Sequence, residues 1–396
     1  ALKVFEKVRA RTGRDKTLSE MREHIRWELR PSSHTSISPV SGLLNILALW
    51  GADREDPDAQ LALQRFDGWL WEDDRDGTRV TGARSAIWDT GFALQALHAA
   101  RPHVDVAQAL AAGDAFLFQQ QIRETFPGYQ EHYRIDSKGG YPFSWGWHGW
   151  PVSDCTAEAM LGRLEANVSG GPSDEDVLMA AQFILRCQGP DGGFGSYEPK
   201  RLRISLEWLN PAEMFGDSMT EMGYTECTAS CITALVEIGK KRPHLLKHPS
   251  LAGMEQAIMR ALAHIQHRQL PEGPWAGSWG VHYIYGTMFG IRGLLAAGTA
   301  PTDPSIRKAC NWLKLHQRPD GSWAERRALH TDQYVEADEG QIIQTAWALT
   351  ALLEAQDPEW DAIERGARFL ARAQLGNGEW PRQLPAGIFF HTALLE

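Results

Sequence analysis

The sequence predicts an all-α fold, an (α/α)6 barrel in which six inner helices alternate with six outer helices. Two interleaved repeats lead to this prediction: one ends helices in a glutamine-to-aromatic turn, and the other begins apolar helices near a threonine. The chain has 396 residues, 43% of them hydrophobic, which is enough to bury the core of such a barrel. Its 16 tryptophans are the third observation, because repeated tryptophan indicates a structural motif or an aromatic-lined cavity.

The first repeat marks the ends of the outer helices. In each copy a helical segment ends in Gln, a glycine follows four residues later, and Phe or Trp follows two residues after that. Glycine tolerates a positive φ and proline cannot continue a helix, so these turns should end the helices. The glutamines are Gln188, Gln269, Gln317 and Gln374, with a degenerate fifth copy in "FLFQQQ" at 116–121. We expect the tryptophans of these turns to be structural: Trp275, Trp323 and Trp380.

The second repeat marks the beginnings of the inner helices. Each copy places a threonine, a residue that can cap a helix, at the start of an apolar segment rich in small residues. Because these segments are apolar around most of their circumference, we expect them to be buried on all sides. Their parallel arrangement would bring six helix N-termini to one end of the barrel, those at Thr90, Thr156, Thr228, Thr287, Thr345 and Thr392.

Composition limits the organisation and the partners. Residues 1–60 are predicted to be a helical lead-in, and residues 61–396 the barrel. The net charge of −10 and the pI of about 5.8 argue against nucleic acid as a partner. Five cysteines without a CxxC motif are typical of free thiols in a reducing compartment. The charged start predicts no signal peptide and no apolar run is long enough to span a membrane, so we expect a location on the cytoplasmic side, with peripheral membrane contact left open.

The predicted end of the barrel also collects an acid and two cysteines. Asp154 lies two residues before Thr156, while Cys155 and Cys227 each precede a barrel threonine. Burial raises the pKa of a carboxyl group, so an aspartate in an apolar cavity can keep its proton at neutral pH, and two weakly donating thiols could tune it. Glu158 falls on the same helix face as the aspartate. The alternatives are a helix N-cap for the aspartate and plain buried positions for the cysteines.

These motifs resemble those of the oxidosqualene cyclases, a family that includes the lanosterol and cycloartenol synthases. The resemblance is carried by "VSDCTAE", "GGFGSYE", "LNPAEMFGD", "GSWGVHYIYGT" and "GIFFHTALLE", and it runs from about residue 33 to the end of the chain. The DxDD motif of the squalene-hopene and diterpene class II cyclases does not occur. The family implies an isomerase that protonates the epoxide of a polyprene such as 2,3-oxidosqualene and closes rings through carbocations. It implies no cofactor and no metal.

The resemblance assigns roles to individual residues. Asp154 matches the family's acid, Cys155 and Cys227 match two cysteines that hydrogen-bond to it, and Glu158 matches an acid that returns the proton through water. Aromatic faces stabilise cations by about 0.5 to 2 kcal/mol each and exclude water. The residues at the aromatic positions of the family's cavity, which we expect to bind substrate, are Trp88, Phe143, Tyr197, Trp279 and Phe389.

Departures from the family leave the activity open. A full member is nearly twice as long, with a second barrel that completes the cavity, and it continues past "HTALLE" with an aromatic tail. Met288 stands where the family usually has Trp. The chain is therefore expected to be the catalytic half alone: a fragment, one of two subunits, or a compact cyclase for a shorter prenyl substrate. The alternative is a non-catalytic half that binds a lipid or a partner chain.

Partners and competing enzyme classes follow from the same residues. We expect an apolar polyprenyl epoxide as substrate, and an exposed apolar surface that meets a second barrel chain, another copy of this chain or a membrane.

A zinc-dependent prenyltransferase barrel would need an Asp-x-Cys pattern to accompany His391, and the sequence has none at an inner helix. A glycosidase needs carboxylates on two sides of a sugar, whereas Asp154 and Glu158 share one helix.

Overall fold

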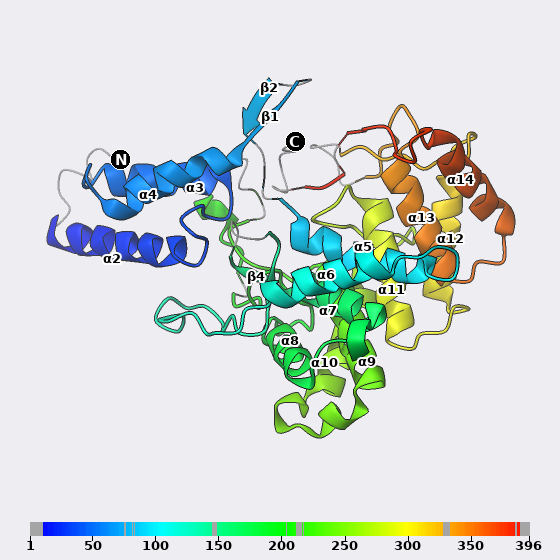
Figure 1. Ribbon diagram of the computed structural model, residues 1–396, viewed down its shortest axis with the longest axis horizontal. Helices are drawn as coiled ribbons and strands as arrows, with labels where there is room; N and C mark the ends of the chain where they lie inside the picture. Colours follow the sequence, from blue (N-terminus) through cyan, green and yellow to red (C-terminus); the bar gives the residue numbers. More distant parts are fainter. Residues whose placement is uncertain are drawn as a thin grey trace. The chain divides into compact units, whose positions relative to one another are not determined.

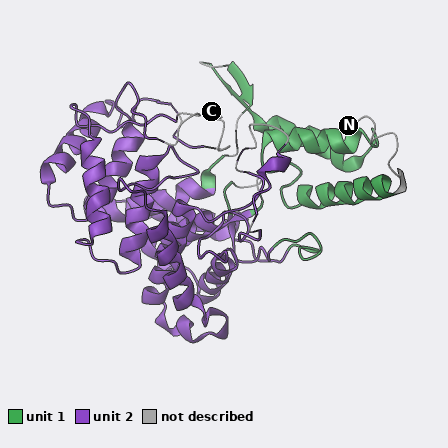
Figure 2. Ribbon diagram, turned by 180° about the vertical axis from the view of Figure 1, so that it is seen from behind, with its two compact units in different colours: residues 1–86, 126–134, 142–150 green, residues 87–125, 135–141, 151–396 purple. Residues whose placement is uncertain are grey.

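The computed structural model describes residues 11–396 except 75–76, 81, 83, 145–148, 203, 211–215, 217, 328–332, 385 and 389–396. The chain divides into two compact units, each described here by itself (Figure 2). The first unit comprises residues 1–86, 126–134 and 142–150, and the second comprises residues 87–125, 135–141 and 151–396. The described part is mainly helical, which confirms the all-α class.

The first unit contains helices and a β-hairpin. The helices are α2 (Arg11–Leu29), α3 (Pro39–Trp50) and α4 (Pro57–Arg65), followed by the 3-10 turn η1 (Phe66–Trp69). Strand β1 (Leu70–Asp73) pairs antiparallel with β2 (Gly77–Val80). Helices α3 and α4 start at the N-caps Ser38 and Asp56, whose side chains accept backbone N–H groups, and each cap is followed by a proline that suits the first helical position.

Helix α3 has a buried face and an exposed apolar face. Ile46 and Leu49 are buried in a small core that includes Leu29 of α2. The opposite face carries large apolar side chains that are between 44% and 59% exposed, those of Leu43, Leu44, Leu47 and Trp50. We call these four residues the α3 apolar face.

The second unit carries the alternating helices (Figure 1). The inner helices are α5 (Ala86–Ala100), α7 (Ser153–Ala166), α9 (Thr225–Lys241), α11 (Tyr283–Ala296) and α13 (Ile342–Glu354). The outer helices are α6 (Ala107–Gln120), α8 (Asp174–Arg186), α10 (Met254–Arg268), α12 (Pro304–Leu315) and α14 (Trp360–Ala373). Consecutive inner helices from α7 to α13 pack against one another. The predicted sixth inner helix, near Thr392, lies outside the described residues.

Short elements connect these helices. The strands β3 (Tyr141–Pro142) and β4 (Pro151–Val152) are two residues each. The 3-10 turns of this region are η2 (Val168–Gly170), η3 (Glu207–Leu209), η5 (Pro243–Lys247) and η6 (Pro249–Leu251). None of the described helices is long and apolar enough to cross a membrane.

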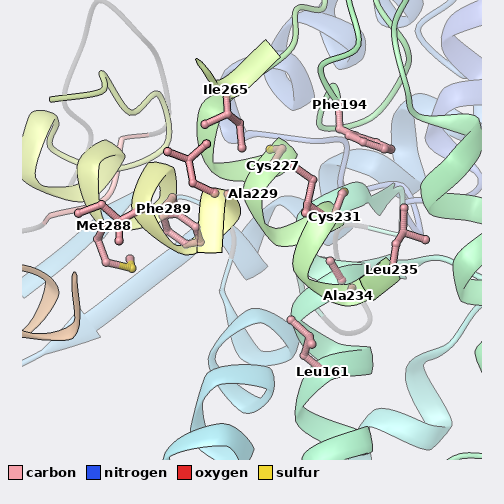
Figure 3. Close-up of a cluster of buried hydrophobic side chains, with 14 of the residues drawn as sticks. Leu161, Phe194, Cys227, Ala229, Cys231, Ala234, Leu235, Ile265, Met288 and Phe289 are labelled. Carbon is pink, nitrogen blue, oxygen red and sulfur yellow. The ribbon is translucent and has the colours of Figure 1, made fainter. Parts of the chain in front are cut away.

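The inner helices form the core of the second unit. Figure 3 shows Cys227 and Cys231 of α9 in a buried cluster that also includes Met288 and Phe289 of α11. A glycine allows α5 to approach α7 closely: a Cβ atom at Gly91 would lie 2.9 Å from the backbone of α7. All five cysteines of the chain are buried and free.

The two sequence repeats are joined by the same hydrogen bond in successive copies. The backbone N–H of the aromatic residue in the turn, or of Tyr141 before α7, donates to the threonine Oγ1 of the next inner helix. The pairs are Tyr141–Thr156 (2.8 Å), Phe194–Thr228 (2.9 Å), Trp275–Thr287 (3.1 Å) and Trp323–Thr345 (3.0 Å). The expectation that these threonines cap their helices is wrong, because each is the fourth or fifth residue of its helix and no N-cap side chain makes a hydrogen bond at these four helix starts. They bind the preceding turn instead.

The glutamines connect neighbouring outer helices. The side-chain amides of Gln188, Gln269 and Gln317 each donate both to a glycine carbonyl of their own turn and to a carbonyl of the following outer helix. For Gln374 the described residues show the bond within its own turn, to Gly378. The acceptors in the next helix are Ala257 for Gln188, Ser305 for Gln269, and Ala362 for Gln317, at 2.7 to 2.9 Å. Gln121 of the degenerate copy does the same with Asp176 at 2.9 Å. This shared geometry explains why glutamine recurs where the outer helices end.

The tryptophans of the turns differ in burial. Trp275 and Trp323 are fully buried, and their indole N–H groups donate to Ile265 and Leu313 carbonyls, both at 2.7 Å. Trp380 makes the corresponding bond to Leu370 at 3.4 Å but is 47% exposed. The turn tryptophans therefore brace the outer helices, most firmly in the two buried copies.

Candidate active site

Asp154 lies in the first turn of α7 and is only 4% exposed. It does not cap the helix, because the N-cap is Val152 and makes no side-chain bond. Its Oδ1 accepts the backbone N–H of Cys155 at 2.7 Å, and its Oδ2 accepts the Cys227 thiol at 3.3 Å. Both carboxyl oxygens thus have donors, and one of these is the thiol from α9.

The surroundings of Asp154 favour its neutral form. Burial raises the pKa of this carboxyl group to about 6, and the charge of Glu158 acts in the same direction. The Cys227 thiol and the Cys155 amide and thiol lower the pKa, since they stabilise the anion. Desolvation outweighs these donors because thiols donate weakly. The site can therefore hold an acidic proton up to about pH 6.

Glu158 is fully buried one helical turn after Asp154. Its Oε2 accepts the Gln95 side-chain amide at 2.7 Å, and its Oε1 accepts the Ser230 hydroxyl at 2.6 Å. Three inner helices, α5, α7 and α9, thus supply one polar cluster. The sequence analysis missed Gln95 and Ser230, although a polar side chain inside an apolar inner helix is a usable signal.

Glu226, directly before Cys227, is a second buried acid that the sequence analysis missed. Its Oε1 accepts the backbone N–H groups of Ser278 at 2.6 Å and Trp279 at 2.7 Å. Its Oε2 is buried without a hydrogen-bond partner among the described residues. Burial raises the pKa of this carboxyl group, which those backbone donors oppose. The repeated pattern acid-Cys-Thr-Ala, at 154 and again at 226, was the signal available in the sequence.

Trp279 lies beside the acid's thiol partner. Its indole N–H donates to Ser196 Oγ at 2.8 Å, and that oxygen is 3.4 Å from Cys227 Sγ. The ring of Trp279 is 5.5 Å from that of Tyr224. Trp279 is therefore joined to Asp154 through Ser196 and Cys227.

The other predicted aromatic residues have different positions. Trp88 on α5 is half-buried and meets Phe92 edge-on, with ring centres 4.8 Å apart. Tyr197 follows Ser196, and its backbone N–H donates to Glu221 at 3.0 Å. Phe143 belongs to the first unit, and Phe389 lies outside the described residues. Of the predicted site, the structure brings together Asp154, Cys155, Cys227, Glu158 and Trp279.

Among the described residues, no group of three or more His, Cys, Asp or Glu side chains could hold a metal ion. His391, which the zinc alternative would use, lies outside the described residues.

Sequence comparison places the chain among cyclases. The family model described as the squalene-hopene cyclase C-terminal domain matches residues 84–394. Lanosterol synthase of Homo sapiens is 35% identical over 402 residues, which cover 98% of this chain and 54% of that protein. Cycloartenol synthase of Dictyostelium discoideum is also 35% identical, covering 100% of this chain and 56% of the relative. The chain thus spans about half the length of these curated relatives.

Solved structures share the fold at lower identity. The apo type II terpene cyclase MstE from Scytonema aligns with a TM-score of 0.51 and 19% identity, over 86% of this chain and 82% of that chain. The ent-copalyl diphosphate synthase of Streptomyces platensis gives a TM-score of 0.53 and 17% identity, over 83% and 50%. These likenesses support the helical barrel fold. The family match and the synthase relatives show that the chain belongs to the squalene-hopene and oxidosqualene cyclase family of class II terpene cyclases.

Proposed function

We propose that this chain supplies the acid of a class II terpene cyclase, in which Asp154 protonates the epoxide of an apolar polyprene. The observation that carries the proposal is the buried Asp154 carboxyl group, with its pKa raised to about 6 and the Cys227 thiol at its Oδ2. The proton moves to the epoxide oxygen, a C–O bond breaks, and a neighbouring alkene attacks the carbon that becomes electron-poor. Further alkenes close further rings, and loss of a proton ends the reaction, so the product is an isomer of the substrate.

The polar neighbours have separate roles in this proposal. Cys155 and Cys227 stabilise the carboxylate that remains after Asp154 gives up its proton. Glu158 accepts hydrogen bonds from Gln95 and Ser230, which orient its carboxyl group one turn away. We assign to Glu158 the return of a proton to Asp154 through water.

The aromatic residues guide the cationic intermediates. Trp279 is the best supported, because its indole is tied to Ser196 next to the acid's thiol partner. An aromatic face within about 6 Å of a cation stabilises it by about 0.5 to 2 kcal/mol. The remaining lining residues in the proposal are Trp88, Phe143, Tyr197 and Phe389.

The comparisons motivate tests with two substrate lengths. The lanosterol and cycloartenol synthase relatives make 2,3-oxidosqualene the first substrate to test. A shorter prenyl substrate is the second, because this chain matches 82% of the MstE chain, and a variant of MstE has been solved with geranylgeranyl dihydroxybenzoate as substrate.

The α3 apolar face supports a further partner. Its four exposed side chains suit contact with a second barrel chain or another copy of this chain, or peripheral contact with a membrane that holds the apolar substrate. Solution mass measured against protein concentration, with and without liposomes, detects self-association and membrane contact. A monomer that ignores lipid at every concentration would contradict both of these.

The function is tested by supplying epoxidised polyprenes of several lengths in detergent micelles. We expect a cyclic product of unchanged mass, detected by gas chromatography and mass spectrometry, and none from Asp154→Asn. The assay is repeated with the N-terminal half of a related synthase added as a separate chain. Binding of the epoxides without turnover in either arm would favour the non-catalytic alternative.

A further inference from the structure

We infer that Ser196 is a positioning residue of the acid, because its hydroxyl joins the Trp279 indole to the Cys227 thiol and thereby to Asp154. This inference rests on the proposed function of Asp154. Ser196 touches neither Asp154 nor, in the proposal, the reacting atoms. Its effect is transmitted through the hydrogen bonds of Cys227.

The hydrogen bonds that lead from Trp279 through Ser196 and Cys227 all donate toward Asp154. An indole N–H only donates, so the Ser196 oxygen accepts from Trp279 at 2.8 Å. The serine proton is then directed at Cys227 Sγ, 3.4 Å away, and the thiol proton at Asp154 Oδ2, 3.3 Å away. The three bonds form one relay of donors that ends on the carboxyl group.

Burial gives this relay its effect. Ser196 and Cys227 are both completely buried, so water does not replace a lost donor. Hydrogen bonds in series polarise one another in a medium of low dielectric constant. The Ser196 hydroxyl therefore strengthens the thiol's donation to the carboxylate that proton transfer leaves behind. Removing it should make Asp154 a weaker acid.

Further hydrogen bonds hold Ser196 and Trp279 of the relay in place. The Ser196 carbonyl accepts the backbone N–H of Ser153, the residue before Asp154, at 2.8 Å. Glu226 Oε1 accepts the backbone N–H of Trp279 at 2.7 Å. These bonds fix the serine to the start of α7 and the tryptophan to the start of α9. The relay is thus preorganised before any substrate binds.

Other titratable groups also face Asp154. They are Cys155 and Glu158 on α7, Glu226, Cys227 and Cys231 on α9, and Tyr285 on α11. Of these groups, Cys227 is the one that is hydrogen-bonded to Ser196, and it is the thiol through which the relay acts. A shift in the Asp154 titration on substitution of Ser196 therefore reports the relay.

The test measures the pKa of Asp154 directly, without substrate. Protein labelled with 13C at aspartate carboxyl groups is titrated by NMR, and the Asp154 resonance is assigned by its loss in Asp154→Asn. In Ser196→Ala we expect the pKa to rise by about 0.5, since the relay contributes only part of one weak hydrogen bond. Trp279→Phe, which keeps a ring but lacks the indole donor, should raise it in the same direction.

Two further variants serve as controls. Ser196→Thr retains the hydroxyl and should keep the wild-type pKa. Ser322 is an equally buried serine in another turn, bonded to Asp320, so Ser322→Ala should leave Asp154 unchanged. An unchanged Asp154 pKa in Ser196→Ala would overturn the inference. If Ser196→Ala fails to fold, an unchanged pKa in Trp279→Phe would overturn it instead.

A double-mutant cycle shows whether Ser196 acts through the thiol. In a Cys227→Ala background, Ser196→Ala should add no further shift, because the relay is already broken. A full additional shift would contradict the relay. Titration does not require turnover, so the two proposals fail separately. A shifted pKa without any cyclase activity would defeat only the proposed function, whereas activity with an unmoved pKa would defeat only this inference.

Discussion

Helices α7 and α9 carry the same pattern, acid-Cys-Thr-Ala, at the same place, yet their acids have different surroundings. Asp154 accepts one backbone N–H and one thiol. Glu226 accepts two backbone N–H groups of the 278–279 loop on one oxygen. Both carboxyl groups are buried, and burial raises the pKa of both. The difference lies in the segments that pack over each helix start.

In the proposed function, Glu226 is a structural acid and Asp154 is the chemical one. Glu226 is one methylene longer than Asp154 and ties a loop to the helix start. Among the described residues, the partners of Asp154 are its own helix and a weakly donating thiol, which in the proposed function leave its proton available. Four residues after each acid the two helices differ again, since α7 has Glu158 and α9 has Ser230 at the equivalent position. The Ser230 hydroxyl donates a hydrogen bond to Glu158. Identical motifs therefore have complementary roles in adjacent helices.

The largest expected effect is that of Asp154→Asn. The amide keeps the size of the side chain but cannot supply the proton. We therefore expect the rate of cyclisation to fall by at least about a thousandfold. Product formation from 2,3-oxidosqualene measures it, with circular dichroism as the check on folding. Substantial residual turnover in the folded variant would mean that Asp154 is not the acid.

The pH dependence is expected to be the next largest effect. The protonated form of Asp154 starts the reaction, and its pKa is about 6. Above that pH, kcat/KM should decline about tenfold per pH unit. A profile measured between pH 5 and 8.5, that instead rises toward alkaline pH, would rule out a protonated Asp154 in the free enzyme.

The raised pKa of Asp154 should also make the stability of the folded protein depend on pH. The folded-state pKa of Asp154, about 6, lies above its ordinary value of 3.8, so its contribution is fully present below pH 3.8 and is lost as the pH rises through 6. At pH 8 Asp154→Asn should therefore raise the free energy of unfolding by up to about 3 kcal/mol, the equivalent of the pKa shift, and should raise it less at pH 5. Thermal melts at both pH values measure this difference. An equal change at both would contradict the raised pKa.

A smaller effect is expected from Cys227→Ala. It removes one weak hydrogen bond of about 1 kcal/mol to the carboxylate, so activity should fall about tenfold. Steady-state kinetics on the same epoxide measure it. Cys310→Ala, which removes a buried thiol of the outer helix α12, is the matched control and should retain activity. Equal losses in both variants would indicate general damage to packing.

The smallest effect is expected from Glu226→Gln, the amide substitution that corresponds to Asp154→Asn. The amide oxygen can still accept the backbone N–H groups of Ser278 and Trp279, so activity should stay within about threefold of wild type. Kinetics of both variants, measured side by side, sharpen the comparison. A loss at Glu226 as large as that at Asp154 would mean that both acids take part in the chemistry.

The helical class and the acid were predictable from local patterns. Apolar periodicity and glycine turns depend on neighbouring residues, so they locate the inner and outer helices without a structure. The resemblance of "VSDCTAE" to the oxidosqualene cyclases likewise points to the carboxyl group of Asp154, and Cys227, like Cys155, directly precedes a barrel threonine. These features follow from residues close together in the chain.

The hydrogen-bond partners were decided only by the tertiary structure. The threonines proved to bind the preceding turns instead of capping helices, and Glu226, Gln95 and Ser196 acquired their positions from segments far away in sequence. Cys227 reaches Asp154 across 73 positions, and Gln95 reaches Glu158 across 63. A buried polar group must find a partner wherever packing supplies one. Sequence patterns therefore predict which polar residues are buried, and the packing of the inner helices decides which of them meet.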